Sequence, residues 1–165
     1  MHTLKRLNDA CERALLVVGT LLFGVLILVV FLQVVTRRVG ISWVWTHEIA
    51  LICFIWTVFL GGAIAVRLRR HYIVELLPAR MIRANVALDV FGDVMIFIVL
   101  YVFIFSGWEF ALLGLRRATR VLQLPQTILF LAFPVSGVFM ALFGVENLVA
   151  SAGRLVGLLR GGKQT

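Results

Sequence analysis

Long, strongly apolar runs recur four times along the chain. They cover residues 14–35, 49–66, 90–108 and 128–149, and the third run contains one carboxylate, Asp93, near its start. A helix that rises about 1.5 Å per residue needs roughly 20 residues to cross a hydrocarbon layer of about 30 Å. The pattern therefore predicts an all-α integral membrane protein whose four transmembrane helices form a single domain over residues 1–165.

Two other segments mix apolar and charged residues. Residues 3–13 place Leu4, Leu7 and Cys11 at helical spacing, with charged side chains elsewhere around the helix, and residues 67–85 mix basic and aliphatic residues. Helices of this kind lie in the plane of the membrane interface. We therefore expect interfacial amphipathic helices in both segments.

The fourth apolar run contains a residue that disturbs regular helix. Pro134 lacks the N–H that the helical hydrogen-bond pattern requires. We expect a bend in the fourth transmembrane helix near this position.

Basic residues decide the predicted orientation. The segments before the first span, between the second and third spans, and after the fourth carry three, five and three Lys or Arg residues, whereas the other two connections carry two and three. Cytoplasmic loops are enriched in Lys and Arg. Both termini are therefore predicted to be cytoplasmic.

The overall charge does not change this interpretation. The formal net charge is +8, but 62% of the residues are hydrophobic and the mean hydropathy is +1.05. Since the basic residues lie between apolar runs, they are interpreted as topology signals and phospholipid contacts. No nucleic-acid partner is predicted.

The sequence offers no group of residues suited to catalysis or cofactor binding. His2, His47 and His71 fall in segments that flank the spans, and Cys11 and Cys53 are far apart. Haem ligation requires histidines inside the bundle, and thiol exchange requires paired cysteines. We therefore predict no catalytic, cofactor, metal or substrate site in this chain, and no enzyme activity.

Some polar, small and basic residues are candidate contacts with another subunit or with lipid. A glutamine in a span can hydrogen-bond across helices, glycines permit close helix approach, and basic residues bind headgroups. Packing within the bundle explains the glutamine and the glycines equally well. The candidates are Gln33, Trp56, Gly61, Gly62, Arg67, Arg69, Arg70 and His71.

Several short motifs occur in a characteristic order. Trp45-Thr-His-Glu48 precedes the second span, Phe59-Leu-Gly-Gly-Ala63 lies within it, and His71-Tyr-Ile-Val-Glu75 follows it. Leu122-Gln-Leu-Pro125 opens the fourth span, which contains Phe133-Pro-Val-Ser-Gly137. In this order and spacing the chain resembles the small permease subunit of TRAP (tripartite ATP-independent periplasmic) transporters.

The resemblance extends from about residue 15 to residue 149, with one departure. The family often has two acidic residues after the tryptophan, whereas this chain has His47 before Glu48. A role carried by the first acid is therefore in doubt here.

The resemblance implies a non-catalytic subunit of a sodium-driven, binding-protein-dependent uptake transporter for organic acids in the bacterial inner membrane. The expected partners are a large permease subunit, present in about equal numbers, a periplasmic substrate-binding protein and membrane phospholipids. The large subunit would hold the substrate and sodium sites, and the small subunit would stabilise its scaffold.

Charged residues in the two non-cytoplasmic connections, together with a tryptophan and a histidine beside them, are candidates for docking the binding protein, because complementary charge guides protein association. These candidates are Trp45, His47, Glu48, Arg116, Arg117 and Arg120.

A homo-oligomeric small channel or exporter is the alternative. Small multidrug exporters also have four spans, but they rely on a carboxylate embedded early in the chain. The first span here has no ionisable residue.

Overall fold

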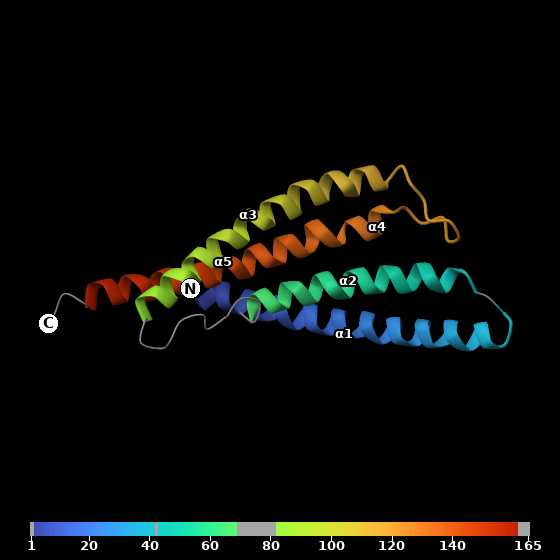
Figure 1. Ribbon diagram of the computed structural model, residues 1–165, viewed down its shortest axis with the longest axis horizontal. Helices are drawn as coiled ribbons and strands as arrows, with labels where there is room; N and C mark the ends of the chain where they lie inside the picture. Colours follow the sequence, from blue (N-terminus) through green and yellow to red (C-terminus); the bar gives the residue numbers. More distant parts are fainter. Residues whose placement is uncertain (1, 42, 69–81, 162–165) are drawn as a thin grey trace.

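The computed structural model of the protein describes residues 2–41, 43–68 and 82–161. Apart from an isolated bridge between Ala118 and Pro125, regular structure in these residues is helical. The helices are α1 (His2–Arg38), α2 (Trp45–Arg67), α3 (Ile82–Gly114), α4 (Thr127–Phe130) and α5 (Ala132–Gly161) (Figure 1).

Four segments are long and apolar enough to cross a membrane, and each coincides with one of the predicted spans. The third continues to Gly114, six residues beyond its predicted end. The prediction of four helices that are long and apolar enough to span a membrane is therefore confirmed. The segments are Asn8–Arg38, Trp45–Arg67, Val94–Gly114 and Thr127–Gly153.

The long helices lie side by side in a row, in the order α1, α2, α5, α3 (Figure 1). Helices α1 and α3 run in one direction, and α2 and α5 run in the opposite direction. The main packing pairs are α1 with α2, α2 with α5, and α5 with α3. Among the described residues, α3 makes no backbone contact with α1 or α2. Helices α1 and α3 are therefore the two edges of the row.

The two ends of the row differ in what they contain. Helix α1 begins, and α2 and α5 end, at one end, which we call the Arg67 end (Figure 1). The opposite end carries the α1–α2 and α3–α4 connections, and we call it the loop end. That the Arg67 end faces the cytoplasm stays a prediction.

A cluster of buried apolar residues lies where α1, α2 and α5 meet. Leu15, Leu60, Ala63, Val66 and Phe143 form this core. Most of the large apolar side chains on α1 are exposed, because α1 is an edge helix that packs mainly against α2. In a membrane, lipid or another protein covers such side chains.

The predicted interfacial segments have different outcomes. Residues 3–13 are not a separate helix but continue into α1 without a break. Their position in the membrane interface stays a prediction. In the second segment, residues 69–81 lie outside the described residues, and residues 82–85 form the first turn of α3.

The expected distortion near Pro134 takes the form of an interruption. Helix α4 ends at Phe130 and α5 begins at Ala132, with Leu131 between them. Because Pro134 has no N–H, the Phe130 carbonyl has no helical donor four residues later. The Leu131 N–H still bonds the Thr127 carbonyl at 2.8 Å, so the chain continues in nearly the same direction.

Helices α3 and α5 approach closely at Gly107. A Cβ atom at this position would lie 2.8 Å from Phe133 Cβ and 3.0 Å from Pro134 Cδ. A Cβ atom essentially never comes within 3.0 Å of a heavy atom on a packed neighbouring segment. The missing side chain at Gly107 therefore allows the α3–α5 contact.

Candidate functional site: the polar contacts of α2

One arginine joins three helices at the Arg67 end. The guanidinium of Arg67, the last residue of α2, pairs with Asp9 and Glu12 of α1 and with Glu146 of α5. Its Nε lies 3.2 Å from Glu12 Oε2, and its terminal nitrogens bind the other two carboxylates. A guanidinium presents five donors in a planar fork and can serve several carboxylates at once. We call these four residues the ion cluster.

Two buried asparagines extend the ion cluster. Asn8 Nδ2 donates to Glu146 Oε2 at 2.6 Å, and Asn147 Nδ2 donates to the Val66 carbonyl at 2.8 Å. The second bond satisfies one of the carbonyls left free at the C-terminus of α2. The Arg67 guanidinium also lies 5.6 Å from the centroid of the Phe143 ring, within the range of a cation–π contact.

Sequence reasoning singled out Arg67 but did not connect it with these partners. Asn8, Asp9 and Glu12 share one side of α1, yet their spacing alone does not distinguish a side facing headgroups from a side facing the bundle. Glu146 lies near the end of the fourth apolar run, where the sequence alone does not identify its partner. The structure places it against Arg67.

At the loop end, Glu48 holds the connection between α3 and α4. Its two carboxylate oxygens accept hydrogen bonds from the backbone N–H groups of Val121 and Leu122, both at 2.9 Å. Glu48 lies in the first turn of α2. One carboxylate therefore fixes a loop that is more than 70 residues away in sequence.

The connection itself is a compact hairpin. The Thr119 N–H donates to the Leu124 carbonyl at 2.8 Å, and the Gln126 N–H donates to the Arg117 carbonyl at 2.9 Å. Gln123 adopts a left-handed conformation with φ of 53°, which reverses the chain. We call residues 115–126 the arginine hairpin.

The arginine hairpin presents three exposed basic side chains. Arg116, Arg117 and Arg120 are all exposed, and none of them pairs with a carboxylate in the part of the chain that the structure describes. The indole rings of Trp43 and Trp45 stack at 5.8 Å at the same end of the row. The loop end therefore carries free positive charge beside a small aromatic surface.

Five of the six predicted docking residues keep their side chains available at the surface, whereas the carboxylate of Glu48 is bonded within the chain. His47 and the three arginines are exposed, and Trp45 is half-buried in the indole stack. Both oxygens of Glu48 are occupied by the arginine hairpin, so its structural role is to position that hairpin.

The remaining candidates lie along the spans. The Trp56 indole N–H donates to the Ile128 carbonyl at 2.9 Å and so joins α2 to α4. Gln33 is half-buried, and its side chain forms no hydrogen bond with the described residues. A Cβ at Gly61 would meet open space, whereas at Gly62 it would meet Met140 Cε at 2.9 Å. Gly62 therefore contributes to packing within the chain.

Three candidate contacts, Arg69, Arg70 and His71, lie outside the described residues. Within the described ranges, no group of three or more His, Cys, Asp or Glu side chains is arranged to hold a metal ion. In the ion cluster, the guanidinium itself occupies the space between the carboxylates.

Comparisons with known proteins give one family match and one curated relative. The sequence profile of the family described as "Tripartite ATP-independent periplasmic transporters, DctQ component" matches residues 26–154. A protein of Haemophilus influenzae, provisionally named a TRAP transporter small permease protein, is 27% identical over 152 residues. The alignment covers 90% of this chain and 93% of that protein. The profile match includes Glu48, Arg67 and Glu146.

Proposed function

The chain belongs to the DctQ component family of tripartite ATP-independent periplasmic transporters, and on this basis we propose that it stabilises the scaffold of a sodium-driven uptake transporter for organic acids. It would act as the small, non-catalytic membrane subunit and pair with a large permease subunit. A periplasmic binding protein would deliver the substrate. This assembly would lie in the bacterial inner membrane, with both termini of the chain in the cytoplasm.

The observation that carries this proposal is the distribution of polar contacts along α2. Glu48 binds the arginine hairpin, Trp56 binds α4, and Arg67 binds α1 and α5. Few water molecules compete for the Trp56 bond inside a membrane, and the contacts of Glu48 and Arg67 join the ends of α2 to neighbouring parts of the chain. Contacts at both ends and in the middle of α2 suit a rigid supporting element.

The sodium and substrate sites are assigned to the large subunit. Ion-coupled carriers generally place ionisable groups deep in the membrane. The carboxylates and the arginine that hold this chain together lie near the ends of its helices instead. The uncovered apolar faces of α1 and α3 offer surface on which a larger membrane subunit can pack.

The first test is purification of the tagged chain from its native membranes in mild detergent. We expect one large polytopic protein to co-purify in about equal amounts, and uptake of an organic acid by the pair in proteoliposomes to require a sodium gradient. Recovery of the chain only as a homo-oligomer would contradict the proposal and favour the small channel or exporter. An uptake rate that is the same with and without a sodium gradient would contradict the proposed coupling of transport to sodium.

The arginine hairpin is proposed as the surface that receives the binding protein. Its three arginines are exposed, and Glu48 orders the backbone that carries them. Facing charges of opposite sign accelerate encounter, and salt screens this effect over a Debye length of about 8 Å at physiological ionic strength. An acidic surface on the binding protein would suit this hairpin.

Neutralising this charge should slow docking. We expect Arg116→Gln combined with Arg120→Gln to lower the association rate of the binding protein at low salt by about tenfold, the lower end of measured electrostatic steering. Stopped-flow binding to the complex in nanodiscs measures the rate. Arg6→Gln combined with Arg13→Gln removes the same charge at the Arg67 end and serves as the control. Equal association rates for the two variants would exclude docking at the hairpin.

A further inference from the structure

The junction between α4 and α5 lacks several helical hydrogen bonds. In a continuous helix, each N–H group bonds the carbonyl four residues earlier. In the described structure, neither the Ala132 N–H nor the Phe133 N–H forms this bond, and Pro134 has no N–H to form it. The carbonyls of residues 128–130 therefore have no helical donor, and α5 holds the end of α4 only weakly.

A side chain of α2 supplies a donor at this junction. The Trp56 indole N–H bonds the Ile128 carbonyl at 2.9 Å and so takes the place of the missing Ala132 N–H. An unsatisfied carbonyl is costly in an apolar span, where water is scarce. The replacement satisfies this carbonyl but connects α4 to α2 instead of α5.

Helix α4 is continuous with the arginine hairpin and lies on the end of α3. Gln126 ends the hairpin, and its carbonyl accepts the Leu129 N–H of α4 at 3.0 Å. The Thr127 hydroxyl donates to the Ala111 carbonyl of α3 at 2.8 Å. Residues 115–130 therefore form one body, which we call the hairpin–α4 unit.

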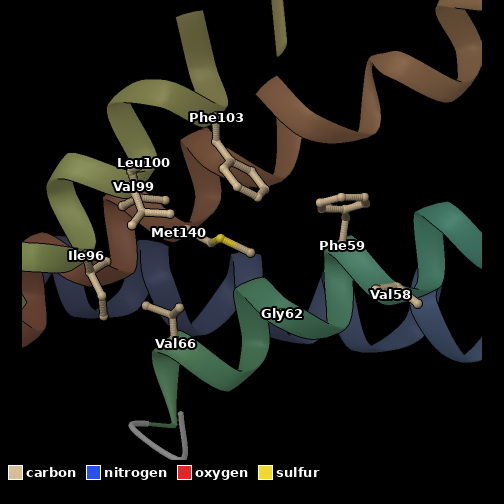
Figure 2. Close-up of a pocket in the computed structure, with 9 residues that line it drawn as sticks. All are labelled: Val58, Phe59, Gly62, Val66, Ile96, Val99, Leu100, Phe103 and Met140. Carbon is tan, nitrogen blue, oxygen red and sulfur yellow. The ribbon is translucent and has the colours of Figure 1, made fainter. Parts of the chain in front are cut away.

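The hydrogen bonds of Glu48 and Trp56 connect the hairpin–α4 unit to α2. Nearer the Arg67 end, α2 and α3 face each other across an apolar groove (Figure 2). The rings of Phe59 and Phe103 meet there with centroids 5.9 Å apart, a contact that contains no hydrogen bond. The position of the unit relative to α2 is therefore determined by the two polar side chains at the loop end.

We propose that the hairpin–α4 unit moves as one body relative to α2, with Leu131 as the hinge, and that Trp56 is the residue that positions it. When the indole bond breaks, the unit separates from α2 while its internal bonds stay intact. The separation also withdraws the N–H groups of Val121 and Leu122 from Glu48. The hairpin arginines then lose their fixed place beside α2, and the consequence of this loss for docking rests on the function proposed above.

Hydrogen exchange of the full-length chain in nanodiscs, followed by NMR, tests the proposal without a binding protein. In Trp56→Phe, the N–H groups of Val121 and Leu122 should exchange faster by about two- to tenfold, the change in equilibrium that one lost hydrogen bond produces. The N–H groups of Thr119 and Gln126 should exchange as in the wild type, because their bonds lie inside the unit.

Trp43→Phe is the matched control. Trp43 is 41% exposed, and its indole N–H forms no hydrogen bond with the described residues, so this variant should leave all four exchange rates unchanged. Unchanged rates at Val121 and Leu122 in Trp56→Phe would overturn the proposal. Equally faster exchange inside the unit would also overturn it, because the hairpin would then unfold locally instead of moving as one body.

The unmodified chain gives an independent measurement. The Trp56 indole N–H should have the same protection factor as the N–H groups of Val121 and Leu122, because one opening exposes all three. Different protection factors for the indole and the two backbone groups, or an indole no better protected than that of Trp43, would contradict a common opening. If the binding protein docks elsewhere, neither exchange measurement is affected, so the two proposals can fail separately.

Discussion

Arg67→Ala is expected to lower the stability of the chain by about 2–4 kcal/mol. Removing one partner of a buried ion pair costs about 3–5 kcal/mol, because the remaining charges are left uncompensated. We place the value lower because the carboxylates are partly solvated: Asp9 is 46% exposed, whereas the Arg67 side chain is 11% exposed. Thermal unfolding in detergent, followed by circular dichroism, measures the change.

Removal of the facing charges should rescue this variant. We expect Arg67→Ala combined with Asp9→Asn, Glu12→Gln and Glu146→Gln to recover most of the lost stability, since the repulsion between the carboxylates is then absent. Arg67→Lys should be intermediate, because an ammonium group keeps the charge but lacks the planar fork of donors. Wild-type stability in Arg67→Ala would show that the ion cluster does not hold the helices together.

Gly107→Ala is the second substitution with a large expected effect. The new Cβ must displace Phe133 or Pro134 on α5, and overpacking of this kind costs about 1–3 kcal/mol. Alanine gains up to about 1 kcal/mol over glycine in helix propensity, which offsets part of this loss. The net result should be a lower unfolding temperature in the same detergent.

Gly61→Ala is the control, because a Cβ at Gly61 meets open space and the helix propensity gain is the same. We expect its unfolding temperature to equal or exceed that of the wild type. Similar unfolding temperatures for the two alanine variants would mean that α3 and α5 do not depend on close contact at Gly107.

The transmembrane helices were predictable because each span is a long apolar run. The predicted third span ended at Trp108 because Glu109 is charged, but α3 continues to Gly114. The side chain of Glu109 is exposed and can reach polar surroundings, so it does not end the helix. The order of the helices in the row was not predictable. All four spans are apolar on most sides, and lipid tails are as apolar as a protein interior, so hydrophobicity does not reveal the packing faces.

The polar contacts were predictable only in part. The distribution of Lys and Arg predicted that Glu48 and the hairpin arginines lie in non-cytoplasmic connections. The hydrogen bonds of Glu48, however, go to backbone N–H groups. Almost every residue has such a group, so the sequence does not indicate which ones bind Glu48. The ion cluster combines residues from the beginning, middle and end of the chain. A single sequence does not show which of several carboxylates will meet Arg67.

The ion cluster also has a consequence for biosynthesis. The Asn8–Glu146 bond joins residues 138 positions apart, so the cluster contains both early and late parts of the chain. When α1 and α2 have entered the membrane, Arg67 has only Asp9 and Glu12 as partners. Its third carboxylate arrives with the fourth span. The cluster therefore becomes complete only after this span has been made, and a chain that terminates before Glu146 lacks the ionic contact between its first helices and α5.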